Sequence, residues 1–376
     1  MSEKTKNRIL PVTFLLFIFS FVIAFVLMPK KDFSESEKRV LAKFPEITAE
    51  SVMNGKFTDG LEKYLSDRFP LRDTFIGIDA YFGLSLGKTG ENGIYNAKDG
   101  YLITAPSKFD ESKCTKNAGY IEKFVDRTGL PSNVIIIPEA GYTLSDKLPL
   151  NHKEYKDGAI FDCVKSTIKN ANFIDVRNAF EKNKTDTQIY YKTDHHLTGR
   201  GSMIVYDEFC KVTGNEKQSF SLLSSTDGFY GTTYSKSGFW LTKSDAVEIY
   251  KCDSKNKYKV TMDDGKVIKE YDSLYFNSHL EEKDKYPVFL DGNHAFVRIR
   301  NENLNNGKKL LLIKDSYAHC FATFAAENYE EIVMIDLRYY KKSLNKLTKE
   351  EQFTEALFMF GAENISTSTD LAWLLM

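Results

Sequence analysis

An aspartate and two histidines, Asp194, His195 and His196, stand side by side in the sequence and are suited to proton transfer. In an extended backbone, residues two apart point to the same side, so Asp194 and His196 share one face and His195 takes the other. A carboxylate beside an imidazole fixes its tautomer and stabilises the imidazolium, as a general base requires. Two histidines in a turn can instead form only local hydrogen bonds, and the pattern alone leaves both readings open.

The same three side chains could also bind zinc. No third imidazole at a fitting spacing accompanies them, which makes a zinc site the weaker reading. The five cysteines are far apart and lack CxxC spacing, which argues against a thiolate metal site or a redox pair. We therefore predict that the protein uses no metal ion and no cofactor.

A serine that could act as nucleophile, Ser316, follows the apolar run 310–313 and precedes a helix-compatible stretch. At such a junction the hydroxyl is exposed at the carboxyl edge of a sheet, where open α/β folds place ligands. Backbone N–H groups at the start of the following helix can stabilise an oxyanion. The alternative is that Asp315 or Ser316 serves only as a helix cap.

The chemistry-bearing segments lie among alternating apolar runs and helical patterns, which is typical of an α/β fold. We predict a mostly parallel sheet in a three-layer arrangement. Its strands are expected at 133–138, 173–176, 310–314, 331–336 and 356–360. The segment at about 220–291 differs in composition and alternates apolar and polar residues, so we interpret it as an inserted β-rich segment near the site.

Helices are predicted from apolar spacing and from capping residues. One amphipathic helix is expected from Phe57 to Arg72, and another ends near Gly129. Thr198 is the expected cap of a helix that follows the histidine segment. A capping box formed by Thr348 and Glu351 predicts the start of a further helix.

The N-terminus carries a membrane signal. An uncharged run at 9–28 follows Lys4, Lys6 and Arg8 and is about as long as a membrane-spanning helix. A cleaved signal peptide is the rival reading, but the run ends without a small-x-small cleavage site. We predict an uncleaved single-pass anchor in the cell membrane. Basic residues lie on both flanks, so the charge rule alone does not orient it. The short N-terminal flank favours a large domain outside the cytoplasm.

The overall charge excludes one class of partner. The chain has 51 Lys plus Arg against 52 Asp plus Glu, a formal net charge of -1. No global field draws it to nucleic acid, so we predict no nucleic-acid partner.

Several segments together resemble the DHHW family, relatives of the alginate O-acetylation proteins within the SGNH-hydrolase superfamily. The agreement runs in order over nearly the whole chain after the anchor. It covers 33–35 with Arg39, then 64–72, 133–138, 190–199, 289–294, 314–317 and 336–340. In this family the Asp-x-His block precedes the serine block, and this sequence has that order.

The resemblance implies Ser316 as nucleophile, His196 as general base and Asp194 as its orienting carboxylate. It implies an O-acetyltransferase or acetylesterase that acts on a cell-surface or secreted polysaccharide through an acetyl-enzyme intermediate. The implied partners are the polysaccharide acceptor and a membrane-bound O-acyltransferase that supplies acetyl groups. A non-catalytic glycan-binding or polysaccharide-assembly protein on the same fold is the alternative.

The uncharged run, the charged and turn-prone segment that follows it, and the resemblance together define the expected domains. Residues 1–8 form a cytoplasmic tail, 9–28 the anchor, 29–56 a stalk, and 57–376 an SGNH-like catalytic domain that contains the insertion. Two departures from the family pattern concern the site. Leu197 stands where the family name has Trp, which predicts a changed aromatic facing substrate, and Lys314 stands where simpler SGNH enzymes have Gly before Asp315.

Further site residues are candidates for substrate or oxyanion binding. Gly292 and Asn293 are the expected oxyanion donors together with the backbone of Ser316, although a turn glycine followed by a capping Asn fits equally well. Arg338 and Tyr339 follow a strand and can line the same edge, although Arg338 could instead only pair with Asp336. The remaining substrate-binding candidate is His195.

Overall fold

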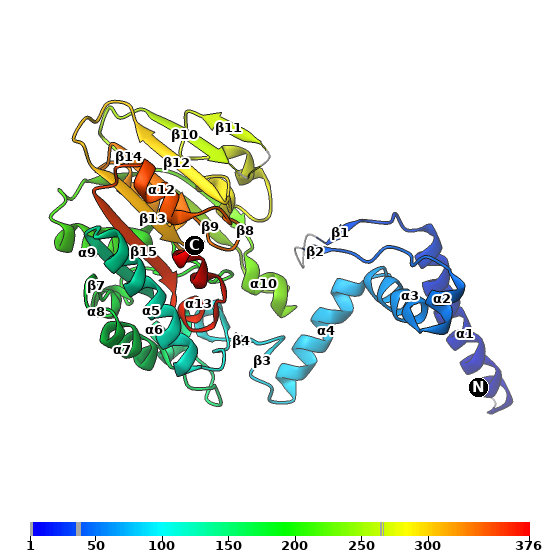
Figure 1. Cartoon of the computed structure of the whole chain (residues 1–376). Helices are drawn as coiled ribbons and strands as arrows, with labels where there is room; N and C mark the ends of the chain where they lie inside the picture. The colour runs from blue at the N-terminus through cyan, green and yellow to red at the C-terminus, as the bar shows by residue number, and fades with distance from the viewer. Residues whose placement is uncertain (1–2, 35–38, 264, 266) are drawn as a thin grey trace. The chain divides into compact units, whose positions relative to one another are not determined.

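The computed structural model describes residues 3–34, 39–263, 265 and 267–376 (Figure 1). The chain forms two compact units. The first comprises Met1–Glu91 together with Ser235–Trp240, and the second comprises Asn92–Tyr234 and Leu241–Met376. These units are defined by packing alone, so the predicted limits of tail, anchor, stalk and catalytic domain stay predictions.

The second unit is built on an eight-stranded sheet. Its strands, in spatial order, are β11 (Ile268–Tyr271), β10 (Tyr258–Asp263), β12 (Phe296–Asn301), β14 (Glu331–Ile335), β13 (Lys309–Lys314), β15 (Glu355–Gly361), β6 (Ser132–Ile137) and β7 (Asn172–Ile174). The five strands from β14 to β7 are parallel, and β12, β10 and β11 extend the sheet in antiparallel fashion. All five predicted strands are therefore present in the parallel part.

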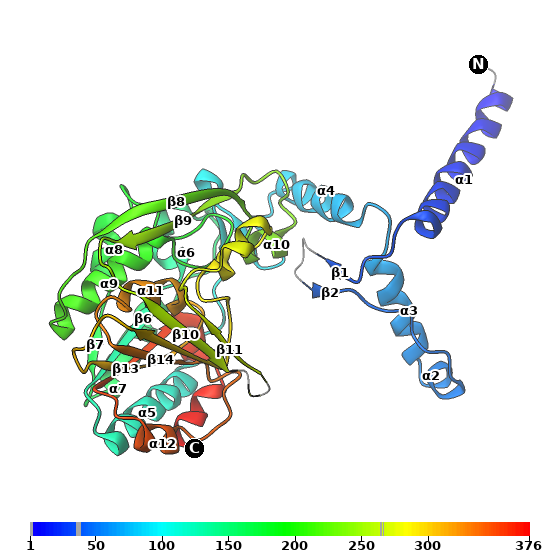
Figure 2. The ribbon, with the colours of Figure 1, turned by 90° about the horizontal axis from the view of Figure 1, so that it is seen from above.

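Both faces of this sheet are covered, as Figure 2 shows. One face packs on α5 (Glu111–Thr128), α7 (Asp157–Thr167), α12 (Leu344–Glu350) and α13 (Ala362–Thr367). The other packs on α9 (Gly199–Thr213), α11 (Ala318–Ala325) and β9 (Asp245–Cys252), which pairs with β8 (Phe220–Phe229).

Strand β13 shows why the sequence gives three layers. Leu310 and Leu312 are buried with α9 and α11, whereas Leu311 and Ile313 are buried with α5 and α7. Alternating side chains point to opposite faces, so a strand that is apolar at every position needs cover on both sides. The predicted α/β fold with a mostly parallel, three-layer sheet is confirmed.

The predicted β-rich segment at about 220–291 contains β8, β9, β10 and β11. Strand β10 pairs along its length with β12, so the segment joins the main sheet. The short elements of the second unit are β4 (Ile94–Asn96), β5 (Leu102–Thr104), α6 (Ala140–Thr143) and α8 (Arg177–Asn183), with α10 (Thr232–Ser237) continuing into the first unit. Five 3-10 turns complete it: Lys98–Gly100, Ser145–Lys147, Asn277–Glu281, Tyr286–Val288 and Asp370–Leu375.

The first unit contains the apolar N-terminal helix α1 (Glu3–Leu27). Its segment Asn7–Leu27 is long and apolar enough to cross a membrane, a property that a signal sequence shares. The other elements are β1 (Phe33–Ser34), β2 (Arg39–Val40), α2 (Ala49–Met53), α3 (Lys56–Asp67), α4 (Arg72–Ser85) and β3 (Gly90–Glu91).

The prediction of one helix from Phe57 to Arg72 was wrong at its end. Helix α3 stops at Asp67, and four residues separate it from α4, which begins at Arg72. Pro70 disfavours helical geometry at Phe69, and Leu71 takes a left-handed conformation with φ 59°. Two helices therefore meet at this turn.

The predicted start of a helix at Thr348 was also wrong. Helix α12 begins after Ser343, whose side chain accepts a hydrogen bond from the backbone of Lys346. Thr348 lies inside the helix and donates to the Leu344 carbonyl at 3.0 Å. An earlier start places Leu344 in the core, and this burial favours Ser343 as the cap.

Two predicted helix ends are confirmed. The Thr198 side chain caps α9 by accepting from Gly201 N at 3.1 Å. Helix α5 ends at Gly129, which adopts the left-handed conformation that glycine takes without strain. The cap on α9 fixes the end of the loop that carries the two histidines.

Candidate active site

A closed loop before α9 carries Asp194, His195 and His196. Its ends are joined by the pairing of Tyr190 with Leu197 and by a hydrogen bond from Tyr191 N to the His196 carbonyl at 3.1 Å. From outside the loop, the Asp245 carboxylate accepts from the backbone of residues 192 and 193 at 3.0 and 2.8 Å. The loop is therefore held from both sides.

Leu197 does not face a substrate site. Its side chain is 1% exposed and packs in the core beside α9. The expectation that Leu197 changes a substrate-facing aromatic was wrong, because the loop's pairing with Tyr190 turns this position inward.

The three candidate catalytic side chains form a continuous line of contacts. His196 Nδ1 contacts Asp194 Oδ1, and the same oxygen accepts from His196 N at 2.9 Å. On the other side of the ring, His196 Nε2 lies 2.8 Å from Ser316 Oγ. His195 Nδ1 lies 2.7 Å from Thr232 Oγ1. The predicted contact of Asp194 with His196 is confirmed. The prediction that His195 takes the opposite face was wrong, because its ring centre lies 3.9 Å from that of His196.

Asp194 is held as a buried carboxylate. Its Oδ2 accepts from Thr232 N at 2.6 Å and from Thr232 Oγ1 at 2.9 Å. Burial alone would raise the pKa of Asp194, but the charges of His196 and His195 and the hydrogen bonds from His196 and Thr232 hold it well below its usual value. A negative charge is thus fixed behind the imidazole.

Gly231 leaves room for this carboxylate. A Cβ atom at this position would lie 2.1 Å from Asp194 Cβ and 2.3 Å from its Oδ2. Any other residue would push Asp194 out of line with His196. Gly231 and Thr232 belong to the inserted segment, and no motif in the sequence marks them.

Asp315 acts as the structural anchor of the serine turn. Its Oδ1 accepts from Tyr317 N at 3.0 Å, and its Oδ2 accepts from Gly361 N and Asn364 Nδ2, both at 2.7 Å. The cap position of α11 is Tyr317, and no side chain accepts a hydrogen bond there. Asp315 therefore braces the turn before the helix, and the Ser316 hydroxyl contacts His196. Neither Asp315 nor Ser316 caps α11 with its side chain.

Two tyrosines hold the imidazole and the serine in place. The Tyr286 ring stacks on His196 with centroids 3.8 Å apart and planes at 10°, and its hydroxyl donates to the Ser316 carbonyl at 3.0 Å. Tyr317 donates to the His195 carbonyl at 3.0 Å. Sequence reasoning missed Tyr286, because nothing in its local sequence relates it to a histidine ninety positions earlier.

A metal ion would compete with these contacts. Asp194, His195 and His196 bring one possible ligand atom each to within 4.8 Å of one another. His196 already contacts Asp194 through Nδ1 and Ser316 through Nε2, and Thr232 occupies the second Asp194 oxygen. A metal could bind only by breaking some of these bonds, and the use of no metal stays a prediction.

A buried charged cluster follows the strands next to Ser316. Lys314 Nζ lies 2.7 Å from His319 Nε2 and 3.1 Å from Asp336 Oδ2. Burial lowers the pKa of Lys314 against the attraction of Asp336, and burial together with the Lys314 charge holds the pKa of His319 well below its usual value. Asp336 also binds Arg338, with Nη2 2.6 Å from Oδ2.

The remaining candidate site residues gather around Arg338. Arg338 donates to Asn293 Oδ1 at 3.0 Å, and its guanidinium lies 5.4 Å from the centre of the exposed Tyr339 ring. Gly292 has φ 80° and donates its N–H to the Phe289 carbonyl at 3.3 Å, as a turn glycine does. Within the described residues, no hydrogen bond joins Gly292 or Asn293 to Ser316, so their oxyanion role stays a prediction.

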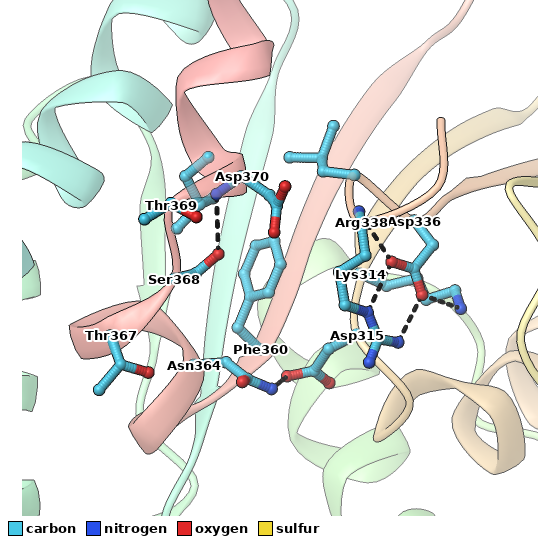
Figure 3. Close-up of a pocket in the computed structure, with 12 residues that line it drawn as sticks. Lys314, Asp315, Asp336, Arg338, Phe360, Asn364, Thr367, Ser368, Thr369 and Asp370 are labelled. Carbon is cyan, nitrogen blue, oxygen red and sulfur yellow. Dashed lines mark hydrogen bonds and ion pairs between the residues drawn. The ribbon is translucent and has the colours of Figure 1, made fainter. Parts of the chain in front are cut away.

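A pocket of about 220 Å³ opens beside Asp315 (Figure 3). Most of the residues that line it are polar or charged, among them Lys314, Asp336, Arg338, Asn364, Ser368 and Asp370. Figure 3 shows Asn364 bound to Asp315 on one side of the pocket and Arg338 bound to Asp336 on the other. The pocket is therefore connected through Asp315 to the turn that carries Ser316.

The family expectation can be tested against known proteins. A model of the DHHW protein family matches residues 151–335. The resemblance to the DHHW family is confirmed. Asp194, His196 and Ser316 all lie within the DHHW segment. No curated protein sequence matches the chain significantly.

Solved structures support the same fold. A DHHW family protein from Eubacterium siraeum DSM 15702 is similar with a TM-score of 0.64 at 20% identity, over 75% of this chain and 95% of that one. Bacillus cereus PatB1, solved with a sulfonyl adduct, is similar with a TM-score of 0.62 at 17% identity, over 73% and 96%. The O-acetyltransferase domain of Pseudomonas putida AlgJ reaches 0.48 at 12% identity, over 75% and 97%. The first two show that the chain shares its fold with these proteins, and the third similarity is too weak to add to it.

A pair of carboxyl groups lies at the same edge of the sheet as Ser316. Glu139 follows β6, and its backbone N–H donates to Asp157 Oδ1 at 2.6 Å. Burial raises the pKa of Glu139 to about 9, and the carboxylates of Asp157 and Glu363 add to this effect. The fold thus favours the protonated form of Glu139.

This pair gives a pH-dependent prediction for stability. A carboxyl whose pKa is raised in the folded state stabilises the fold fully at pH values below its unfolded pKa, and this contribution is lost as the pH rises through the folded pKa. Glu139→Gln keeps a neutral side chain at every pH. We expect it to raise the free energy of unfolding by roughly 1–3 kcal/mol at pH 8 and by little at pH 4. Thermal unfolding at both pH values measures the difference, and an equal effect at both would contradict the prediction.

Proposed function

We propose that this protein is an extracytoplasmic O-acetyltransferase, or a closely related acetylesterase, that acts on a cell-surface or secreted polysaccharide. The observation that carries the proposal is the line of contacts from Asp194 through His196 to Ser316, with 2.8 Å between His196 Nε2 and Ser316 Oγ. The choice of acetyl group and polysaccharide rests on the DHHW family's relation to alginate O-acetylation proteins.

In the first half of the reaction, His196 Nε2 takes the Ser316 hydroxyl proton while Oγ attacks the acetyl carbonyl carbon. Asp194 accepts from His196 Nδ1 and stabilises the imidazolium with its fixed negative charge. The tetrahedral intermediate then breaks its bond to the donor oxygen, which takes the proton from His196. An acetyl ester of Ser316 remains.

In the second half, His196 removes a proton from a sugar hydroxyl or from water. The resulting oxygen attacks the acetyl ester, and Ser316 leaves with the proton returned by His196. A sugar acceptor makes the enzyme a transferase, and water makes it an esterase. The stacked Tyr286 ring restrains the imidazole between the two half-reactions.

The oxyanion formed in each half needs hydrogen-bond donors. The Ser316 N–H precedes α11 and has no acceptor among the hydrogen bonds of the described residues, so we assign it this role. We assign acceptor binding to the polar pocket beside Asp315, with Arg338 on its wall, and to the neighbouring Asn293 and Tyr339. His195, which is partly exposed beside His196, is a further contact for the substrate.

The apolar helix α1 supports the proposal that the protein is anchored in the cell membrane. A membrane-bound O-acyltransferase would then supply acetyl groups to the active site. The large domain would lie on the extracytoplasmic side, where the polysaccharide acceptor is found.

The proposal is tested with the detergent-solubilised full-length protein, p-nitrophenyl acetate and an oligosaccharide acceptor. Release of nitrophenol reports the first half-reaction, and acetylated oligosaccharide reports transfer. Because PatB1 has been solved with a sulfonyl adduct, a sulfonyl fluoride is a suitable inhibitor. Oligosaccharide binding without any nitrophenol release would favour the non-catalytic glycan-binding alternative.

Asp194→Asn separates charge from shape. The asparagine NH₂ must face either Thr232 N–H or His196 Nδ1. In the first orientation two donors face each other, and in the second the imidazole is forced into the wrong tautomer. We expect kcat for nitrophenyl acetate to fall about 10³- to 10⁴-fold while the fold is kept. Steady-state kinetics and circular dichroism measure the two effects, and a loss below tenfold would remove Asp194 from the mechanism.

A further inference from the structure

Helix α4 and its two ends carry an exposed apolar stripe. Phe75, Ile78 and Phe82 are spaced three or four residues apart on one face of the helix. Leu71 and Leu86, which flank the helix as its cap residues, extend the stripe at either end. Their side chains are between 42% and 71% exposed. Such a continuous apolar surface marks contact with a partner or a membrane.

The stripe is not the face by which α4 packs in its unit. The opposite face is formed by the small, buried residues Gly77, Ala80 and Gly83. Gly77 lies directly against Trp240, because a Cβ atom there would be 1.3 Å from the indole nitrogen. The small residues thus pack within the unit, whereas the large ones are exposed, and of these Phe75 also contacts Phe21 of α1.

The stripe continues from the surface of the membrane-length helix α1. The Phe21 ring stacks on Phe69 with centroids 5.4 Å apart, and lies 5.9 Å from Phe75 of the stripe. Phe25 packs on Tyr64 of α3 at 6.1 Å. Helices α3 and α4 therefore pack against the C-terminal end of α1 through aromatic contacts.

These contacts set the depth of α4. Phe21 precedes Leu27, the end of the apolar segment, by six residues, which corresponds to about 9 Å along a helix. Helices that lie in the membrane interface bury their apolar face about 5–10 Å into the boundary between headgroups and acyl chains. A residue in contact with Phe21, as Phe75 is, lies at that depth when α1 spans the bilayer.

We propose that α4 lies in the outer interface of the lipid bilayer and that its apolar stripe is covered by lipid. This inference rests on the proposed retention of α1 as an anchor. The membrane anchor would then consist of the spanning helix α1 and the amphipathic helix α4 in the interface. Helix α4 would add apolar contact area with the membrane and restrict rotation of the first unit about α1.

The test uses the full chain in phosphatidylcholine nanodiscs with Phe82→Trp as a depth reporter. Lipids brominated at a shallow or a deep acyl position quench tryptophan emission only at close range. The emission of the parent protein, which contains Trp240 and Trp373, is subtracted from that of the variant, and the remainder is the emission of the new tryptophan at position 82. We expect bromine at the shallow acyl position to quench this emission more strongly than bromine at the deep position. Leu86→Trp is a second reporter on the stripe in case the first variant misfolds.

Asp73→Trp provides the matched control, because Asp73 is exposed on the opposite side of the same helix. Its added emission should be lost much less. Equal quenching of tryptophan on the two faces would overturn the inference, as would the absence of quenching on both faces in discs that contain the protein. Either result would instead favour a protein partner as the group that covers the stripe. Failure of the folded protein to enter discs would overturn the anchor itself, while acetyl transfer in detergent would test the enzymatic proposal separately.

Discussion

Alanine at Ser316 is expected to abolish both nitrophenyl acetate turnover and acetyl transfer. The change removes the oxygen that forms the acyl bond and leaves the turn intact, because that turn is held by Asp315 and not by the serine hydroxyl. We expect kcat to fall by about 10⁴-fold or more, as is usual for the loss of a nucleophile. Oligosaccharide binding and the thermal unfolding midpoint should change little.

Ser221→Ala is the matched control for this substitution, because Ser221 is an exposed serine on β8. It should keep full activity. If Ser316→Ala retains more than a few per cent of the parent rate, the nucleophile is a different residue and the proposed mechanism is wrong.

The second large effect is expected at His196. His196→Ala removes the group that takes the serine proton and should lower kcat about as much as Ser316→Ala, because residues that act as a unit have non-additive effects. The double variant should therefore be no slower than either single variant. Steady-state kinetics of all three variants form the cycle that measures this coupling.

The neighbouring histidine supplies the control. His195→Ala should lower the rate only a few-fold, because His195 hydrogen-bonds Thr232 and not Ser316. A large loss from His195→Ala with a small loss from His196→Ala would reverse the assignment of the general base.

The core of the candidate site could be predicted because its signals are local. Asp194 and His196 are two residues apart, and the apolar strand before Ser316 identifies a sheet edge. The strands of the parallel sheet were equally visible, since their residues are apolar at every position. The same local reasoning predicted the Thr198 cap.

The residues that support the site could not be predicted in this way. The segment at about 220–291 supplies Gly231, Thr232 and Tyr286, which are far along the chain from Asp194 and His196. Their roles depend on the path of the chain in three dimensions and not on spacing. The buried position of Leu197 is of the same kind, because it follows from pairing with Tyr190.

Two errors had a local cause. The sequence does contain the signal that ends α3, since Pro70 restricts the residue before it, but the apolar spacing continues through Phe69 and hides the break. Thr348 and Glu351 match a capping box, yet Ser343 also caps, and the burial of Leu344 decides between them. Packing can thus choose between two locally acceptable helix starts.

The most direct test of the central claim is the intact mass of the full-length protein after brief incubation with p-nitrophenyl acetate and acid quenching. We expect an increase by one acetyl group that maps to the peptide containing Ser316. The increase should be absent from Ser316→Ala and should decay when the oligosaccharide acceptor is added. Acetylation that persists in Ser316→Ala at the parent level, or that maps to another residue, would contradict the account.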